Sequence, residues 1–150
     1  PSAPPTPNSD AVHPVTELDQ LLPETDLLFM SLPSVSDTVN ILNADRMALL
    51  PKGAYVVNVG RGTAIDQDAL IKALDSGHLA GAALDVVVPE PLPADHPLRK
   101  AKNLLLTPHV AGNMTLGYTC ERNVQLFCEN LENYAAGRPM HHLVDRRKGY

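Results

Sequence analysis

Four short apolar runs alternate with stretches of mixed polarity along the chain. The runs cover residues 26–32, 54–59, 79–88 and 103–107. Within each run apolar residues follow one another without regular polar alternation, which predicts strands that are buried on both faces. Strands of this kind, separated by helices, favour an α/β fold in which a parallel sheet has helices on each side.

Helix start and stop signals fill the gaps between these runs. Thr16 can cap a short helix over residues 17–22, and Asn43 and Asp66 can each cap a further helix. Gly77 stands where it would end the helix that Asp66 begins. The predicted order of elements therefore alternates strands and helices.

The two ends of the chain depart from this central pattern of residues 15–112. Residues 1–14 are rich in proline, which builds neither helix nor sheet, so we expect a linker or loop. Residues 113–136 predict a long helix with one apolar stripe, about 36 Å long at ~1.5 Å per residue. A helix of that length could bridge to another domain, and we expect residues 113–150 to form this helix and an extended tail.

Charge and hydropathy limit the partners that the chain could have. The 150 residues carry a net charge of −5, and 44% of them are hydrophobic. An acidic chain argues against nucleic acid or an anionic membrane as the main partner. No apolar run reaches the ~18 residues of a membrane span.

Cysteine and histidine spacing limits the chemistry further. Cys120 and Cys128 lie in the predicted long helix, which separates their Cα atoms by about 12 Å and excludes a disulfide between them. We therefore expect reduced cysteines and a cytoplasmic protein. The chain has neither a helical i, i+4 histidine pair nor a Cys-x-x-Cys motif, so we expect no metal site.

A pair of glycines follows the second apolar run and flanks a single arginine, in Gly60-Arg61-Gly62. The pair begins like a G-x-G-x-x-G phosphate loop, but Ile65 fills the third position, where a small residue is needed for helix packing. No other G-x-G-x-x-G occurs in the chain, so a pyrophosphate loop is not expected in these residues. The glycines would instead let the backbone approach a cofactor ring closely.

Three chemically active residues follow three different apolar runs. Arg61 follows the second run, Glu90 the third and His109 the fourth. Singly, each has an ordinary structural explanation, as a solvated loop charge or a structural histidine. The carboxyl ends of parallel strands meet at one edge of a sheet, so the three could converge there. An arginine for a carboxylate, a histidine for proton transfer and a carboxylate behind the histidine suit the reduction of a 2-keto acid, with hydride from a cofactor.

The stretches that carry these residues resemble a known family. LLPKGAYVVNVGRGTAIDQDALIKALDSGHLAGAALDVVVPEPLPADHPL, followed by LLLTPHVAGN, is similar to the D-isomer-specific 2-hydroxyacid dehydrogenases, and the likeness runs from about residue 16 to 137. It implies an α/β fold: the second half of a Rossmann-like parallel sheet with flanking helices. Residues 15–112 would be the C-terminal part of a dinucleotide-binding domain. Residues 113–150 would return to a substrate domain that this chain does not contain.

The resemblance also implies a role for each candidate residue. Arg61 would bind and polarise the substrate, His109 would be the acid/base, and Glu90 would tune it. Asp85 would hold the carboxamide of NAD or NADP. The residues implied to contact the nicotinamide half of the cofactor are Leu32, Pro33, Thr38, Val59, Gly60, Arg61, Asp85, His109 and Gly112.

Within the family, EPLPADHPL and LVDRRKGY look most like glyoxylate/hydroxypyruvate reductases. That likeness implies a homodimeric, NAD(P)-dependent oxidoreductase that reduces a small 2-keto acid to the D-2-hydroxy acid. Arg99 departs from the tryptophan expected there and resembles formate dehydrogenases, but that branch carries glutamine at the position of Glu90. The alternatives are a dinucleotide-sensing, corepressor-like binding protein on the same fold, or an inactive fragment without measurable cofactor affinity.

Overall fold

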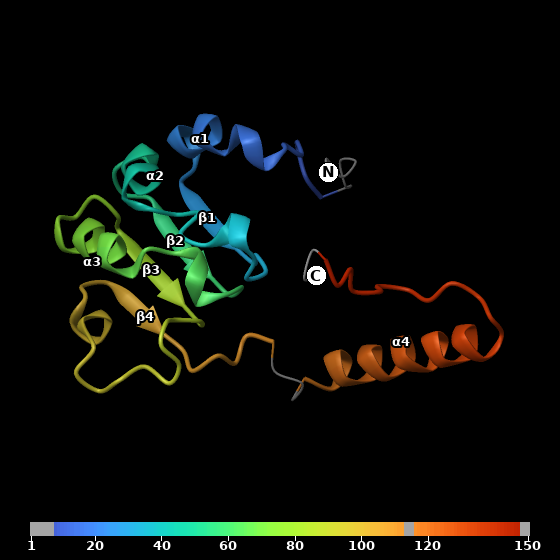
Figure 1. The fold of residues 1–150 in the computed structure, drawn as a ribbon. Helices are drawn as coiled ribbons and strands as arrows, with labels where there is room; N and C mark the ends of the chain where they lie inside the picture. Colours follow the sequence, from blue (N-terminus) through green and yellow to red (C-terminus); the bar gives the residue numbers. More distant parts are fainter. Residues whose placement is uncertain (1–7, 113–115, 148–150) are drawn as a thin grey trace. The chain divides into compact units, whose positions relative to one another are not determined.

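The computed structural model describes residues 8–112 and 116–147. The described residues form two compact units, one within residues 1–108 and the other within residues 109–150. The first unit is built around a sheet, and the second around one long helix (Figure 1). No helix in the described part of the chain combines the length and the apolar character that a membrane span needs.

The sheet of the first unit has four strands in the order β1-β2-β3-β4, and every neighbouring pair is parallel. This confirms the predicted parallel α/β sheet. Each strand is shorter than its apolar run, and after β3 the run continues into loop residues that are also buried, such as Val86. The strands are β1 Leu27–Met30, β2 Tyr55–Asn58, β3 Gly81–Leu84 and β4 Leu104–Leu106.

Two of the three predicted helix caps are confirmed. Asn43 caps α2 (Ala44–Leu49) by accepting a hydrogen bond from the backbone N–H of Arg46 at 3.0 Å. Asp66 caps α3 (Gln67–Asp75) in the same way, from Ala69 at 3.0 Å. Gly77, with φ of 71°, follows the end of α3 in the left-handed conformation that favours glycine.

The first helix differs from the prediction. Residues 15–24 form two 3-10 turns around a single α-helical turn, α1 (Leu18–Leu21), and Thr16 makes no capping bond because it lies inside the first 3-10 turn. Pro23 prevents a longer helix, since it lacks the N–H that would continue the hydrogen-bond ladder. Leu22 still packs into the core, fully buried.

The core lies on one face of the sheet, between the strands and the helices α2 and α3 (Figure 1). Met30, Val56 and Leu84 point to this face and are at most 5% exposed. They pack with buried side chains of both helices, among them Met47 and Leu70. Burial therefore alternates along the strands, and within the described first unit the expectation of helices on both faces is not met.

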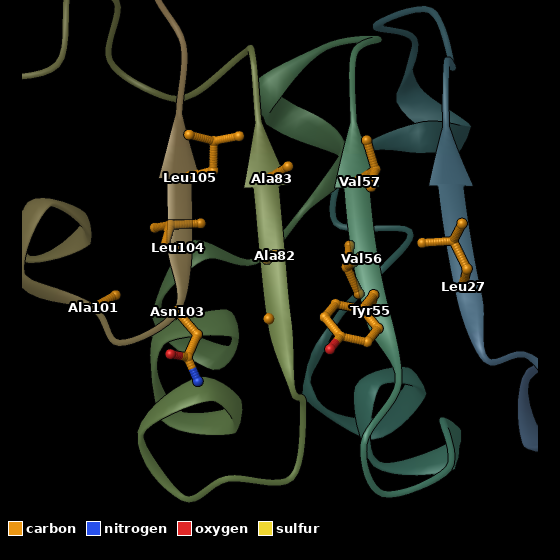
Figure 2. A pocket seen from close by; sticks show the side chains of 11 residues that line it. Leu27, Tyr55, Val56, Val57, Ala82, Ala83, Ala101, Asn103, Leu104 and Leu105 are labelled. Carbon is orange, nitrogen blue, oxygen red and sulfur yellow. The ribbon is translucent and has the colours of Figure 1, made fainter.

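The opposite face of the sheet is apolar and open. One row across the four strands, in register, consists of Phe29, Val57, Ala83 and Leu105. Phe29 is 60% exposed and Leu105 is 62% exposed. Figure 2 views this face, where the side chains of Tyr55, Val57 and Leu105 line a shallow hollow and the helices lie behind the sheet.

The second unit contains the long helix α4 (Gly117–Ala135) and a tail. The sequence predicts this helix from residue 113, and residues 113–115 lie outside the described part. Gly137, with φ of 64°, follows shortly after its carboxyl end. The tail folds back along the helix, because the Asn130 amide accepts from the His141 N–H at 2.7 Å and donates to the His141 carbonyl at 3.0 Å.

The helix α4 exposes the apolar stripe that the sequence places on it. The exposed fractions of its larger members range from 55% for Val124 to 71% for Tyr134, and none of its residues is buried. Cys120 and Cys128 both lie in α4 and are exposed, free cysteines.

Because one face of the sheet is packed and the other is open, we expect truncation to alanine to lower the unfolding free energy by different amounts on the two faces. Leu84→Ala removes a side chain from the packed face, so unfolding free energy should fall by about 2–5 kcal/mol. Phe29→Ala removes an exposed side chain from the open face and should cost less than about 1 kcal/mol. Urea denaturation measures both. Equal losses would show that the second face is covered.

Candidate active site

The four strands end at one edge of the sheet, and most of the candidate residues follow those ends. Leu32 and Pro33 follow β1, and Val59 extends β2 by donating its N–H to the carbonyl of Met30 at 2.9 Å. Asp85 directly follows β3. The carboxyl edge of an open parallel sheet is where such folds bind ligands.

Gly60 and Gly62 allow the loops at this edge to touch. A Cβ on Gly60 would lie 2.5 Å from the backbone nitrogen of Leu32, and a Cβ on Gly62 would lie 2.5 Å from the backbone carbonyl of Val87. Any larger residue would push the backbones apart. Both glycines therefore allow close contacts with the loops after β1 and β3, and the predicted approach to a cofactor ring stays a prediction.

Asn58, the last residue of β2, organises the loop that carries Arg61. Its side chain is fully buried, and its Oδ1 accepts from the Gly60 N–H while its Nδ2 donates to the Arg61 carbonyl, both at 3.0 Å. Asn58 is not among the site residues predicted from the sequence. The signal is present, because it is the one polar residue within the apolar run 54–59.

Arg61 itself is exposed at this edge. Its Nη1 donates to the carbonyl of Gly60 at 2.8 Å, which uses one of the five N–H donors of a guanidinium. Its backbone is fixed by Asn58 and begins the 3-10 turn Gly62–Ala64. The positively charged guanidinium of Arg61 is therefore attached to a backbone that hydrogen bonds hold in place.

The loop after β1 is tied internally by Thr38. Its hydroxyl donates to the carbonyl of Pro33 at 2.7 Å and accepts from the Val35 N–H at 3.0 Å. A bond of 2.9 Å between the hydroxyls of Ser34 and Thr63 joins this loop to the one after β2. Thr38, predicted as a cofactor contact, therefore supports the loop that presents Pro33.

Asp85 is buried at the end of β3, with 6% of its surface exposed. Its Oδ1 accepts from the hydroxyl of Thr107, which follows β4, at 2.5 Å. Its backbone N–H donates to the carbonyl of Asn58 at 3.0 Å. Thr107, which is not among the residues predicted from the sequence, thus orients the carboxylate.

Glu90 lies on an exposed loop between two prolines, and its carboxylate is bound to the same loop. Its Oε1 accepts from the backbone N–H of Val87 at 2.9 Å. Further along, Arg99 donates from Nε to the Pro93 carbonyl at 2.8 Å and from Nη2 to the Leu92 carbonyl at 2.7 Å. Arg99, which stands where the resemblance expects a tryptophan, therefore closes this loop.

His109 and Gly112 belong to the second unit, whereas Arg61, Asp85 and Glu90 belong to the first. The structure thus brings together the loops after β1, β2 and β3. It does not place His109 relative to these loops, because His109 lies in the other unit. His109 is exposed and has φ of 55°, a conformation uncommon for residues other than glycine. Within the described residues no three His, Cys, Asp or Glu side chains gather as metal ligands would.

Comparisons with family descriptions, curated proteins and solved structures all indicate the same family. Residues 2–111 match the family described as D-isomer specific 2-hydroxyacid dehydrogenase, NAD binding domain. The chain is 45% identical over 96 residues to the glyoxylate reductase of Thermofilum pendens, which covers 64% of this chain and 28% of that protein. It spans less than half the length of the curated relatives it matches first.

Two solved structures share the fold. The crystal structure of a D-isomer specific 2-hydroxyacid dehydrogenase from Xanthobacter autotrophicus Py2 with NADPH and MES has a TM-score of 0.79 and 40% identity, and covers 90% of this chain and 54% of that one. The NADPH-dependent glyoxylate/hydroxypyruvate reductase of Sinorhizobium meliloti with NADP and sulfate has a TM-score of 0.79 and 32% identity, with 90% and 43% covered. The chain therefore belongs to the family of NAD-binding domains of D-isomer specific 2-hydroxyacid dehydrogenases.

Proposed function

We propose that the full-length protein is an NAD(P)-dependent oxidoreductase that reduces a small 2-keto acid to the D-2-hydroxy acid. The observation that carries the proposal is the Arg61 loop: an exposed guanidinium on a buried, hydrogen-bonded support at the carboxyl edge of the sheet of a family member. Glyoxylate and hydroxypyruvate are the proposed substrates, because the names of several relatives specify them.

The residues at this edge fit the nicotinamide half of NAD or NADP. The Asp85 carboxylate is buried and oriented by Thr107, which suits an acceptor for the carboxamide N–H of the cofactor. Leu32, Pro33, Val59 and Gly60 would line the ring, and Thr38 would support the loop that carries Leu32 and Pro33. The family resemblance implies that His109 and Gly112 would contact the ring as well. When bound, the reduced cofactor supplies the hydride. Two solved relatives contain NADPH or NADP, which makes NADPH the first cofactor to test.

Arg61 is proposed to bind the substrate carboxylate and to polarise the keto oxygen. A guanidinium can hold a carboxylate through two parallel hydrogen bonds, and four of its five donors are left after the bond to Gly60. Fixing the loop through Asn58 reduces the reorganisation needed when charge develops on the keto oxygen.

His109 is proposed to donate the proton to the developing hydroxyl group, with Glu90 behind it. The left-handed backbone of His109 supports this role, because residues other than glycine in that region cluster at functional sites. The hydrogen bond from Val87 fixes the Glu90 carboxylate, which could then hold the histidine in one tautomer. A homodimer and a cytoplasmic location are further proposals that follow from the family resemblance.

The proposal predicts that the full-length protein oxidises NADPH or NADH when glyoxylate or hydroxypyruvate is added. Arg61→Lys should lower kcat/KM by about 10²–10³-fold, because a point charge replaces a bidentate donor that also polarises the keto oxygen. Absorbance at the reduced nicotinamide band measures the rates.

The matched control is Arg46→Lys, the same change at an arginine that binds Asp19 and the carbonyl of Ile41. It should keep the wild-type rate. If the wild-type protein turns over no small 2-keto acid with either cofactor, the reductase proposal is wrong, and the corepressor-like binding role gains support.

The hydrogen bonds of Asn58 to the Arg61 loop predict that a change at Asn58 also affects the reaction. Asn58→Asp keeps the size of the side chain but turns the donor toward the Arg61 carbonyl into an acceptor. Unfolding free energy should fall by about 1–3 kcal/mol, and KM for the keto acid should rise. The control is Asn103→Asp, at an exposed position with φ of 52° that aspartate also tolerates. Equal losses in the two variants would contradict a special role for Asn58.

A further inference from the structure

We infer that Gln67, on the first turn of α3, is a positioning residue for the Glu90 carboxylate. Its side-chain amide binds both polar groups of one backbone residue: Nε2 donates to the Val88 carbonyl at 2.5 Å, and Oε1 accepts from the Val88 N–H at 2.9 Å. Only one orientation of the amide satisfies both bonds, because the N–H needs an acceptor and the carbonyl a donor. The inference rests on the proposed function, in which Glu90 acts on His109.

The helix end that carries Gln67 is itself fixed. Gln67 is the first residue of α3 and follows Asp66, whose side chain accepts from Ala69 and whose N–H donates to the Leu42 carbonyl at 3.1 Å. Ala69 and the neighbouring Leu70 are buried. The amide of Gln67 therefore extends from a rigid base to a loop that is 21 residues away in sequence.

Gln67 holds the part of the loop that precedes Glu90, whereas Arg99 holds the part that follows it, through the carbonyls of Leu92 and Pro93. Pro89 and Pro91 have no N–H, so Val88 supplies one of the few backbone donors next to Glu90. The preceding residue, Val87, packs against Gly62 and donates its N–H to the Glu90 carboxylate at 2.9 Å. Gln67 thus fixes Val88, and the adjacent Val87 fixes Glu90.

Gln67 is linked to Glu90 only indirectly, through the loop that contains Val87 and Val88. Among the described residues, the side chain of Gln67 hydrogen-bonds to Val88 and to none of the three proposed catalytic side chains, so it would act through the backbone of residues 87–88. A carboxylate that supports a histidine must be placed within a fraction of an ångström, since a 1 Å error can cost ~10²-fold in rate. The bidentate amide supplies that placement on a loop that is otherwise exposed.

A double-mutant cycle in the full-length protein tests the inference. Gln67→Leu removes both bonds and should lower kcat for the keto acid about tenfold, with KM unchanged because Arg61 binds the substrate. Glu90→Gln should lower kcat as well. The double variant should fall no lower than Glu90→Gln alone, because both changes act through the same carboxylate. A double variant whose loss is the product of the two single losses would overturn the inference.

Lys72→Gln is the matched control, because Lys72 is exposed on the same helix and should leave kcat unchanged. Gln67→Glu is a second variant, which keeps an acceptor for the Val88 N–H and loses the donor. Its kcat should lie between those of the wild type and Gln67→Leu. A kcat for Gln67→Glu equal to that of the wild type, in protein of wild-type melting temperature, would count against the amide as the acting group.

Hydrogen–deuterium exchange resolved to single amides gives a readout that is independent of turnover. In Gln67→Leu the Val88 amide should exchange at least about tenfold faster because it loses its acceptor, and the Val87 amide should follow because the Glu90 carboxylate moves. Faster exchange at Val88 alone would overturn the link to Glu90. If the wild-type protein proves inactive, the proposed function fails, and this measurement still decides whether Gln67 positions Glu90.

Discussion

The close approach of the strand-end loops is the constraint on which the candidate site depends. Gly60 lies against the backbone of Leu32, and Gly62 lies against the backbone of Val87, at distances that leave no room for a Cβ. These two contacts join the loops after β1, β2 and β3 into one edge. Arg61 stands between the two glycines, so its position is set from both sides.

Side-chain amides and hydroxyls hold what the glycines bring together. Asn58 fixes the Arg61 loop from inside the sheet, Thr107 orients Asp85, and Gln67 binds the backbone next to Glu90. Each of these side chains hydrogen-bonds to a residue with a proposed role or to the backbone beside one. The residues with a proposed catalytic or binding role are thus held in place by polar residues that have no such role. Support of this kind gives a site the precise placement that catalysis requires.

The sequence predicts the parallel sheet and the caps at Asn43 and Asp66, because apolar runs and capping residues are local patterns. It predicts the family because the stretches around Arg61, Glu90 and His109 are similar to those of known members. It does not reveal Gln67, whose partner Val88 lies 21 residues away and shares no periodicity with it. It also predicts a sheet covered on both faces, because residues such as Phe29 and Leu105 are apolar whether or not a neighbour covers them. The roles of Arg61, Glu90 and His109 stay predictions, as does the substrate.

The most direct test of the central claim is a crystal structure of the full-length protein with NADP and oxalate, a small anion that resembles a 2-keto acid and cannot be reduced. The account predicts that the Arg61 guanidinium and the His109 imidazole both lie within about 3.2 Å of oxalate oxygens. It also predicts that the Glu90 carboxylate binds the other ring nitrogen of His109. An imidazole turned away from the anion, and beyond hydrogen-bond reach of both Arg61 and Glu90, would contradict it.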